Sequence, residues 1–263
     1  MLNPKQVLLY TAITHQGRWD DMFVALREKK DLPDPDEVAA VAKKYEGQAL
    51  TIFDDLYPDR LRNAPRPPLV LFYQGDIELL KDADRMIAFT GSHDSGSAYA
   101  EKMVATIAKE ATKKGAIVVS GLSRSCQSIA LESALSVGQC IAVLSNGLDQ
   151  NYPIESSGLQ AKIAKKGLVL SPFPNGVKPS VDGIRARNLL LGQLGSFLFV
   201  AAAKKHDGVL LTMASAVNVG CDAGCLPFPA ESEFVNNSLI RNGAAMIESA
   251  DDLLFEAGFK KDE

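Results

Sequence analysis

The sequence lacks the segments that would place the protein in or across a membrane. None of its apolar runs approaches the roughly 20 residues of a membrane-spanning helix. The first residues, Met1 to Lys5, contain neither the apolar stretch nor the cleavage site of a secretory signal peptide. We therefore predict a cytoplasmic protein with no membrane partner.

Cysteine and histidine are scarce, and neither is spaced like a set of metal ligands. The last two cysteines are separated by three residues, whereas zinc and redox motifs use two. We predict reduced, partly buried thiols and no bound metal. The residues concerned are Cys126, Cys140, Cys221, Cys225, His15, His93 and His206.

Motifs for catalysis and nucleotide hydrolysis are missing as well. No glycine-rich turn leads into the Gly-Lys-Ser/Thr of a P-loop, and the third glycine of a dinucleotide fingerprint is absent. No serine sits in a nucleophile-elbow motif. Asp149 and Glu155 flank one predicted turn, where Asp149 is better explained as a local turn cap. We predict that the protein is not an enzyme and needs no cofactor.

Positive charge is in slight deficit overall but is unevenly distributed. The formal net charge is −4. By count, residues 1–60 carry 8 basic and 11 acidic side chains, and residues 248–263 carry 2 and 6. The central stretch, 61–247, is then left with an excess of three positive charges. This pattern permits binding of a polyanion there, although the chain is not a globally basic nucleic-acid binder.

What the sequence does contain is a regular alternation of short apolar runs with helical patterns. Such alternation predicts an α/β fold, a Rossmann-like doubly wound and mostly parallel sheet with helices on both faces. Residues 1–47 form a small helical N-terminal region, and 48–263 form the Rossmann-like domain. We expect strands at 69–73, 86–89, 116–119, 140–144, 168–170, 197–201 and 223–228, and helices at about 4–30, 36–45, 100–111, 126–137, 156–166, 185–194, from 207 onward, and 237–243.

Small residues follow several of these strands where ligands bind in open α/β sheets. Gly91 and Ser92 follow one strand, and Ser120 and Gly121 end another. Small side chains let a ligand approach the backbone, and the N–H groups at helix starts favour anions. Arg124 adds a cation to the second of these turns. We predict a site for a phosphate-bearing ligand at this edge of the sheet.

The order and spacing of many short segments resemble the bacterial DNA-processing protein A family, also called DprA or Smf. The resemblance covers about 190 residues, from Tyr57 to Gly243. Its segments include Pro68–Gly75, Thr90-Gly91-Ser92, Ser120–Arg124, Gly147-Leu148-Asp149, Tyr152-Pro153, Gly176–Pro179, Arg187-Asn188 and Leu239–Ala244.

The resemblance implies a protein that binds single-stranded DNA as a homodimer and delivers it to a RecA-type recombinase during natural transformation. It also implies roles for individual residues: Lys178 matches the lysine of a Gly-x-Lys-Pro loop, and Arg187 with Asn188 matches an Arg-Asn pair. Together with Arg124, these cations suit phosphates, and the amide suits bases or sugar. His93 stands where the family usually has arginine, so one phosphate contact is weaker here.

Two further readings of the chain are kept open. One is a divergent pocket of the same superfamily that binds a nucleotide-like small molecule, and the other is a degenerate scaffold without a ligand. For the DNA reading we expect Phe173 or Tyr152 to supply a stacking surface. The apolar segments 244–247 and 253–255 are expected to form the dimer contact or to belong to the core.

Overall fold

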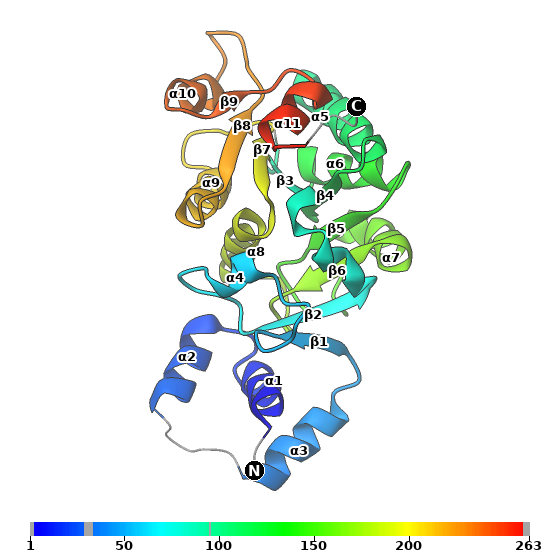
Figure 1. Ribbon diagram of the computed structural model, residues 1–263, viewed down its shortest axis with the longest axis vertical. Helices are drawn as coiled ribbons and strands as arrows, with labels where there is room; N and C mark the ends of the chain where they lie inside the picture. The colour runs from blue at the N-terminus through cyan, green and yellow to red at the C-terminus, as the bar shows by residue number, and fades with distance from the viewer. Residues whose placement is uncertain (1–2, 29–33, 95, 260–263) are drawn as a thin grey trace.

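The computed structural model describes residues 3–28, 34–94 and 96–259, and a single sheet organises most of them (Figure 1). Its strands alternate with helices from residue 86 onward, as the sequence predicts. In the described part of the chain they are β1 (Gln48–Thr51), β2 (Val70–Gly75), β3 (Met86–Thr90), β4 (Ile117–Gly121), β5 (Cys140–Val143), β6 (Leu168–Ser171), β7 (Phe197–Val200), β8 (Asp222–Cys225) and β9 (Ala245–Met246).

The strand order across the sheet is β1-β2-β6-β5-β4-β3-β7-β8-β9. The seven strands from β6 to β9 run parallel, whereas β1 and β2 are antiparallel additions at one edge. The doubly wound, mostly parallel sheet is therefore confirmed. The strand expected at 69–73 is β2, but its antiparallel pairing and the strand β1 beside it were not predicted.

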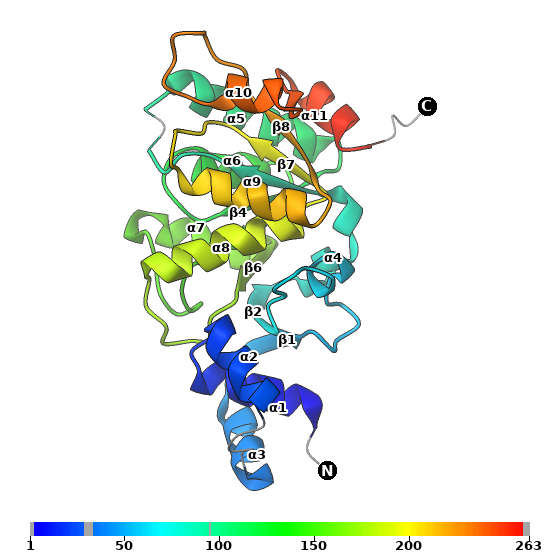
Figure 2. The same ribbon diagram turned by 90° about the vertical axis from the view of Figure 1, so that its left-hand side faces the viewer.

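Helices cover both faces of this sheet (Figure 2). One layer contains α5, α6, α7 and α11, and the other contains α4, α8 and α9. The bounds are α1 (Pro4–Thr14), α2 (Trp19–Glu28), α3 (Pro35–Lys44), α4 (Asp59–Arg62), α5 (Ala98–Lys113), α6 (Cys126–Leu135), α7 (Ser157–Lys166), α8 (Val181–Leu194), α9 (Gly208–Asn218), α10 (Asn236–Arg241) and α11 (Ala250–Glu256), with short 3-10 turns at Ile77–Lys81, Ala83–Arg85 and Ile154–Ser156.

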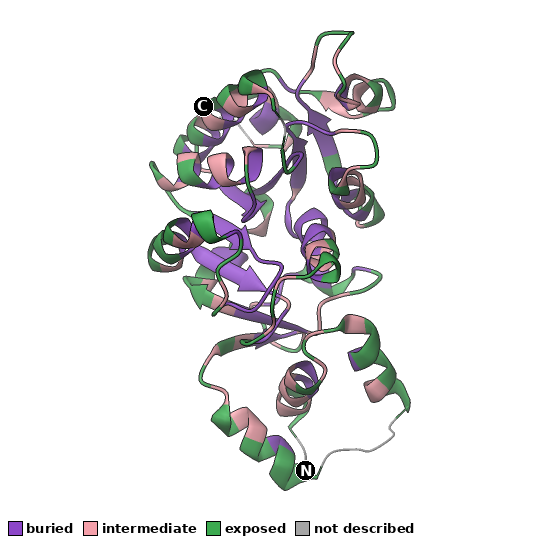
Figure 3. Cartoon of the chain, turned by 180° about the vertical axis from the view of Figure 1, so that it is seen from behind, coloured by how far each residue is buried: buried purple, intermediate pink, exposed green. Residues whose placement is uncertain are grey.

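The core lies on both faces of the parallel strands (Figure 3). Every residue of β3 to β7 is buried, which explains why these strands have continuous apolar runs rather than alternation. Phe89 of β3 and Phe199 of β7 meet edge to face, with ring centroids 5.1 Å apart. The central strands are thereby fixed to each other by side chains as well as by the ladder.

The N-terminal region contains two helices where the sequence analysis expected one at 4–30. The prediction of a single helix was wrong because the chain turns at Gln16 and Gly17, with φ of 54° and 69°. Gly17 closes the turn by donating its N–H to the carbonyl of Ala12 at 2.8 Å. The third helix is as expected and begins at Pro35 after the cap Asp34. Among the described residues, no helix is both long and apolar enough to cross a membrane.

Candidate functional site

The sheet has its switch point between β3 and β7. From β3 the chain winds through β4, β5 and β6 in one direction, and then returns by α8 to β7 on the other side of β3. Loops at the carboxyl ends of these strands therefore diverge to opposite faces and leave a crevice between them. In open α/β sheets this is the place where ligands bind.

The loops after β3 and β7 are tied together at this crevice. The N–H of Ser92 donates to the carbonyl of Ala202 at 2.8 Å, and the Ser92 hydroxyl donates to the carboxylate of Asp207. Asp207 also caps α9 through the N–H of Val209. Gly91 and Ser92 are both buried here. The N–H of Ser92 therefore forms a hydrogen bond within the protein and is not free to bind an anion. The sequence analysis had expected a free N–H here.

The end of β4 is closed by side chains from two helices. The hydroxyl of Ser120 donates to the carbonyl of Phe89 at 2.7 Å, which is a contact within the sheet. A Cβ atom on Gly121 would lie 2.7 Å from Oε1 of Gln127 and 3.1 Å from Nε of Arg187. The glycine therefore lets the Arg187 side chain come close to the strand end.

Arg187 is a cation held beneath the surface of the site. It lies on α8 with 7% of its surface exposed, and its guanidinium donates to Oδ1 of Asn188 at 2.9 and 3.2 Å. Among the described residues no carboxylate lies within ion-pair distance of it. Burial lowers the pKa of Arg187 to about 10, so it remains a cation at neutral pH. A buried charge without a counter-ion is costly, and an anionic ligand would relieve that cost.

Asn188 connects Arg187 to the neighbouring loop. While its oxygen accepts from Arg187, its Nδ2 donates to the carbonyl of Gly208 at 3.2 Å. The amide is thus oriented by groups on both sides. The sequence-predicted pair Arg187 and Asn188 is brought to the same edge as Gly91 and Gly121.

Arg124 lies in the loop after β4 and is exposed, as predicted. Its guanidinium pairs with the carboxylate of Glu155 at 2.8 Å, and both side chains are about 60% exposed. Hydrogen bonding from its own backbone N–H, and the charge of Arg124, lower the pKa of Glu155. An exposed pair of this kind contributes about 0–1 kcal/mol, so a phosphate can compete for Arg124.

Lys178 is exposed on the loop between β6 and α8, and among the described residues it has no ion-pair partner. The loop itself is held in place: Asp149 accepts from the N–H of Gly176 at 2.8 Å, and the N–H of Gly147 donates to the carbonyl of Val177 at 2.9 Å. Asp149 thus holds a loop 27 residues further along the chain, whereas a cap of its own local turn was expected.

The predicted stacking surface needs a correction. Phe173 is 6% exposed and packs into the interior, so it cannot present a face to a base. Tyr152 is 37% exposed. The misprediction arose because Phe173 stands in a loop rich in proline and glycine, where the sequence gives no sign that the turn between α1 and α2 covers it.

A group of aromatic side chains at the same edge was missed by the sequence analysis. Tyr99, Phe228 and Phe234 line a hollow of about 600 Å³ between the start of α5 and the loop before α10. The only sequence signal was the segment Pro227-Phe228-Pro229, where two prolines bracket an aromatic residue in a loop.

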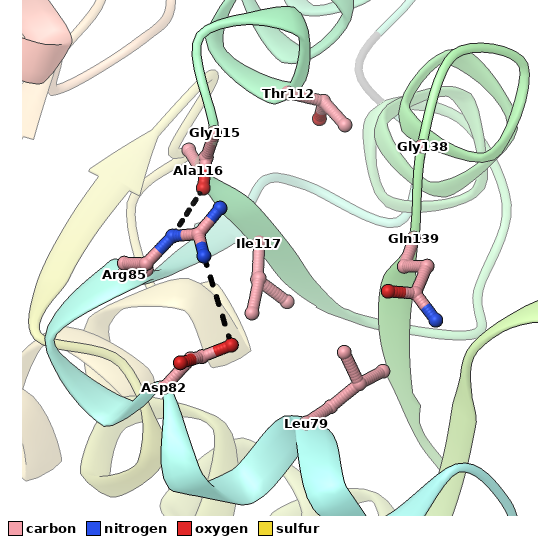
Figure 4. A pocket seen from close by; sticks show the side chains of 9 residues that line it. All are labelled: Leu79, Asp82, Arg85, Thr112, Gly115, Ala116, Ile117, Gly138 and Gln139. Carbon is pink, nitrogen blue, oxygen red and sulfur yellow. Dashed lines mark hydrogen bonds and ion pairs between the residues drawn. The ribbon is translucent and has the colours of Figure 1, made fainter.

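A smaller cavity of about 200 Å³ lies at the opposite, amino edge of the sheet (Figure 4). There Arg85 donates to the carbonyl of Gly115 at 2.7 Å and lies 3.7 Å from the carboxylate of Asp82. The Arg85 guanidinium thus hydrogen-bonds a backbone carbonyl just after the C-terminal end of α5.

The four cysteines are free and buried, in agreement with the expectation of reduced thiols. Burial raises the pKa of Cys140 and of Cys225 to about 12, which keeps these thiols protonated and unreactive. In the described ranges there is no group of three or more histidine, cysteine or acidic side chains that could hold a metal ion.

Comparison with known proteins gives consistent matches. The sequence model of the family described as DNA recombination-mediator protein A matches residues 48–258. The chain is 34% identical over 219 residues to protein Smf from Synechocystis, and 32% identical over 217 residues to DNA processing protein DprA from Streptococcus pneumoniae. Each match covers 80% of this chain. It spans 54% of the Synechocystis protein, about half its length, and 74% of the Streptococcus pneumoniae protein.

Two solved structures share the fold. The X-ray structure of DprA from Streptococcus pneumoniae superposes with a TM-score of 0.82 at 27% identity, covering 97% of this chain and 99% of that one. DprA from Helicobacter pylori, studied for its single-stranded DNA binding mode, superposes with a TM-score of 0.72 at 26% identity, covering 81% of this chain and 96% of that one.

Proposed function

The chain belongs to the DNA recombination-mediator protein A family, and on this basis we propose that it binds single-stranded DNA at the carboxyl edge of its sheet and mediates recombination. The observation that carries the proposal is the buried cation Arg187, which has no acidic partner among the described residues. A DNA phosphate would supply the missing counter-ion.

Two exposed cations extend this site along the same edge. Lys178 follows β6 and Arg124 follows β4, so they stand on loops two strands apart in the sheet. Together with Arg187 they would contact successive phosphates, because phosphate contacts fix the register of a strand without reading its sequence. Gly91, Ser92, Ser120 and Gly121 would shape the floor of the site rather than contribute charge.

The partners proposed from the sequence follow from the same function. We propose that the protein acts in the cytoplasm as a homodimer, and that it passes single-stranded DNA to a RecA-type recombinase during transformation of competent cells. The Helicobacter pylori relative, with its single-stranded DNA binding mode, supports the DNA part of this proposal. We further propose that residues 48–263 form the DNA-binding domain, with 1–47 as its helical appendage, and that no chemical step takes place.

A second function is favoured by one observation. Arg187 and Asn188 are only 7% and 5% exposed, which suits a small anion that can enter the crevice better than a polymer that must pass over it. A nucleotide-like small molecule would bind there through the same two side chains. A thermal-shift panel of free nucleotides tests this alternative.

Titration of a labelled oligothymidine by fluorescence anisotropy tests the DNA proposal. With about 3–5 phosphate contacts, log affinity should fall with log salt at a slope of roughly −2 to −3.5. Arg124→Ala and Lys178→Ala should each weaken binding, the double variant most, and each should flatten the slope by about 0.7. Duplex DNA should bind less tightly.

Lys109→Ala is the matched control for these variants. Lys109 is an exposed lysine near the far end of α5, away from the carboxyl edge. Its replacement should leave both affinity and salt slope unchanged. If the double variant binds as well as the wild type, or if the wild type does not bind at low salt, the DNA assignment fails.

A further inference from the structure

The hollow beside the loop after β8, at the carboxyl edge of the sheet, is lined by residues that suit a flat, uncharged ligand. Its volume of about 600 Å³ is typical of small-ligand sites. Aromatic and proline rings make up most of its wall. The lining residues are Gly96, Ser97, Tyr99, Pro227, Phe228, Pro229, Ser232, Glu233 and Phe234.

The three aromatic rings form a continuous but open group. Tyr99 meets Phe228 edge to face with centroids 5.6 Å apart, and Phe228 meets Phe234 at 4.3 Å with the rings tilted by 37°. Tyr99 nevertheless keeps 44% of its surface exposed, and the other two rings are half-buried. Ring surface of this group is thus left open to a ligand while the ring positions are fixed by mutual contact.

Charge at the rim is balanced. The carboxylate of Glu233 pairs with the ammonium group of Lys204 at 2.9 Å, and the same ammonium lies 5.7 Å from the centroid of Phe234. Among the described residues that line the hollow, Glu233 is the one charged side chain, and none of them offers an uncompensated cation to a phosphate. The chemistry that fits it is an aromatic ring with polar edges.

The hollow shares an edge of the sheet with the proposed phosphate contacts. Lys178 follows β6, whereas Phe228 and Phe234 follow β8, and Tyr99 is in the first turn of the helix after β3. Five strand spacings separate β6 from β8, or roughly 24 Å at about 4.8 Å each. One extended strand of nucleic acid can therefore meet both regions.

We propose that this hollow is a nucleobase site, in which Tyr99, Phe228 and Phe234 stack a base of the strand whose phosphates are held by Lys178, Arg124 and Arg187. The inference rests on the proposed DNA binding. Along this edge, cations follow β4 and β6, and aromatic rings follow β8. The cations suit the phosphate of a nucleotide, and the rings suit its base. Stacking of this kind does not select sequence, because every base has an aromatic face.

The test compares the affinities of two oligomers for two kinds of variant. An oligothymidine and an abasic oligomer of equal length carry the same phosphates, and only the first has bases. Tyr99→Ala and Phe228→Leu remove a ring, whereas Tyr99→Phe and Phe228→Tyr keep it. Affinities are measured by anisotropy, and thermal unfolding verifies that each variant is folded.

We expect the wild type to prefer oligothymidine over the abasic strand. Tyr99→Ala and Phe228→Leu should each lose roughly 5- to 100-fold in affinity for oligothymidine and little for the abasic strand. The ring-keeping variants should bind like the wild type, and the salt slope should not change. Photo-crosslinking of a 5-iodouracil oligomer should mark Tyr99, Phe228 or Phe234.

Other results separate the two proposals. If the wild type binds both oligomers equally, or if the ring-removing variants weaken both alike, the nucleobase site is refuted while DNA binding stands. Crosslinks confined to other loops also refute it. If the wild type binds neither oligomer, the DNA function and the base site are both overturned.

Discussion

At the scale of single residues, Arg187 determines how the proposed site responds to pH and to substitution. Its folded-state pKa of about 10 lies below the reference value of 12.5, so between these values the unfolded chain binds more protons and stability rises with pH. Below pH 10 the group is charged in both states. The desolvation cost is therefore constant across working pH and is offset only when an anion binds.

We expect Arg187→Lys to weaken oligothymidine binding by about 10-fold and Arg187→Met by about 10- to 100-fold. Lysine keeps the charge but not the planar fork, and methionine keeps only the length. The ratio of wild type to Arg187→Met should stay constant between pH 7.5 and 9, because the guanidinium does not titrate there. Anisotropy at the two pH values measures this. Equal binding by wild type and Arg187→Met would remove Arg187 from the site.

Ser125 stores backbone strain at the start of α6. Its φ of 59° and ψ of −135° lie in a region that glycine adopts and that costs other residues about 1–3 kcal/mol. The Ser125 hydroxyl donates to Glu101 at 2.9 Å, which offsets part of this cost. The position lies one residue from Arg124, so the strain sits inside the proposed binding loop.

We predict that Ser125→Gly is more stable than Ser125→Ala by about 1 kcal/mol. Both changes remove the hydroxyl, but only glycine relieves the strain. At an ordinary position near a helix the order is reversed, since glycine is less stable than alanine by up to about 1 kcal/mol. Urea unfolding of the two variants measures the difference. An alanine variant that is the more stable would show that the backbone here is not strained.

Single residues also mark the limit of prediction from the sequence. Arg124 was singled out from its charge and its place after a predicted strand, whereas Lys178 and the pair Arg187 and Asn188 were singled out only through the family resemblance. That Arg124 pairs with Glu155 was not predicted, because this contact joins residues 31 positions apart. Whether a residue is buried depends on distant segments, and sequence spacing does not report it.

At the scale of elements, the N-terminal helices support the loop that carries Lys178. Gly17, in the turn between α1 and α2, faces Pro172 and Phe173: a Cβ there would lie 2.4 Å from the carbonyl of Pro172 and 3.1 Å from Phe173. The half-buried ring of Tyr45, which follows α3, packs against Phe72 with centroids 5.4 Å apart. The small helical region therefore helps to position part of the proposed site.

We predict that Gly17→Ala lowers the free energy of unfolding by about 2 kcal/mol more than Gly220→Ala does. The two glycines have nearly the same φ, 69° and 70°, but a Cβ at Gly220 would meet nothing within 4 Å. Because backbone strain is nearly the same in the two variants, the difference between their free energies of unfolding measures the contact between the Gly17 turn and the loop. Chemical denaturation measures the stabilities, and oligothymidine binding should weaken only in Gly17→Ala. Equal losses in the two variants would mean that the turn does not support the loop.

Elements were predictable where their pattern is local. The parallel strands from β3 to β8 and the helices between them follow from short apolar runs and helical spacing. The break at Gly17 and the strands β1 and β9 were not predicted. A two-residue strand such as β9 has no pattern of its own and forms only because β8 lies beside it.

At the scale of the whole molecule, the family assignment and the fold agree with the resemblance found in the sequence motifs. That resemblance rests on the order of many short segments, which is a property of the whole chain. The positive excess of the central stretch, 61–247, coincides with the domain that carries the cations. The long-range electrostatic field that would attract DNA is therefore weak, and local contacts have to supply most of the affinity.

The edge of the sheet at β9 carries apolar side chains that we expect to form a homodimer contact. The parallel part of the sheet ends at β9, an edge strand whose Met246 is 53% exposed, and Phe255 on the nearby α11 is 77% exposed. Ile247, Leu253 and Leu254 from the same segments are buried in the core, so only part of the predicted apolar patch is available for a partner. Within the described part of the chain β9 pairs only with β8, and an edge strand with an exposed apolar side chain favours pairing with a second copy.

We expect the wild type to be a dimer at tens of micromolar, a rough working range, by light scattering after size-exclusion chromatography, and Met246→Lys combined with Phe255→Glu to be a monomer. The introduced charges should prevent association, because burying them in an apolar dimer contact costs desolvation free energy. Val217→Lys is the matched control, because Val217 on α9 is 61% exposed and lies outside these segments. It should remain a dimer. A wild type that is monomeric at this concentration, or a double variant that stays dimeric, would exclude this edge as the interface.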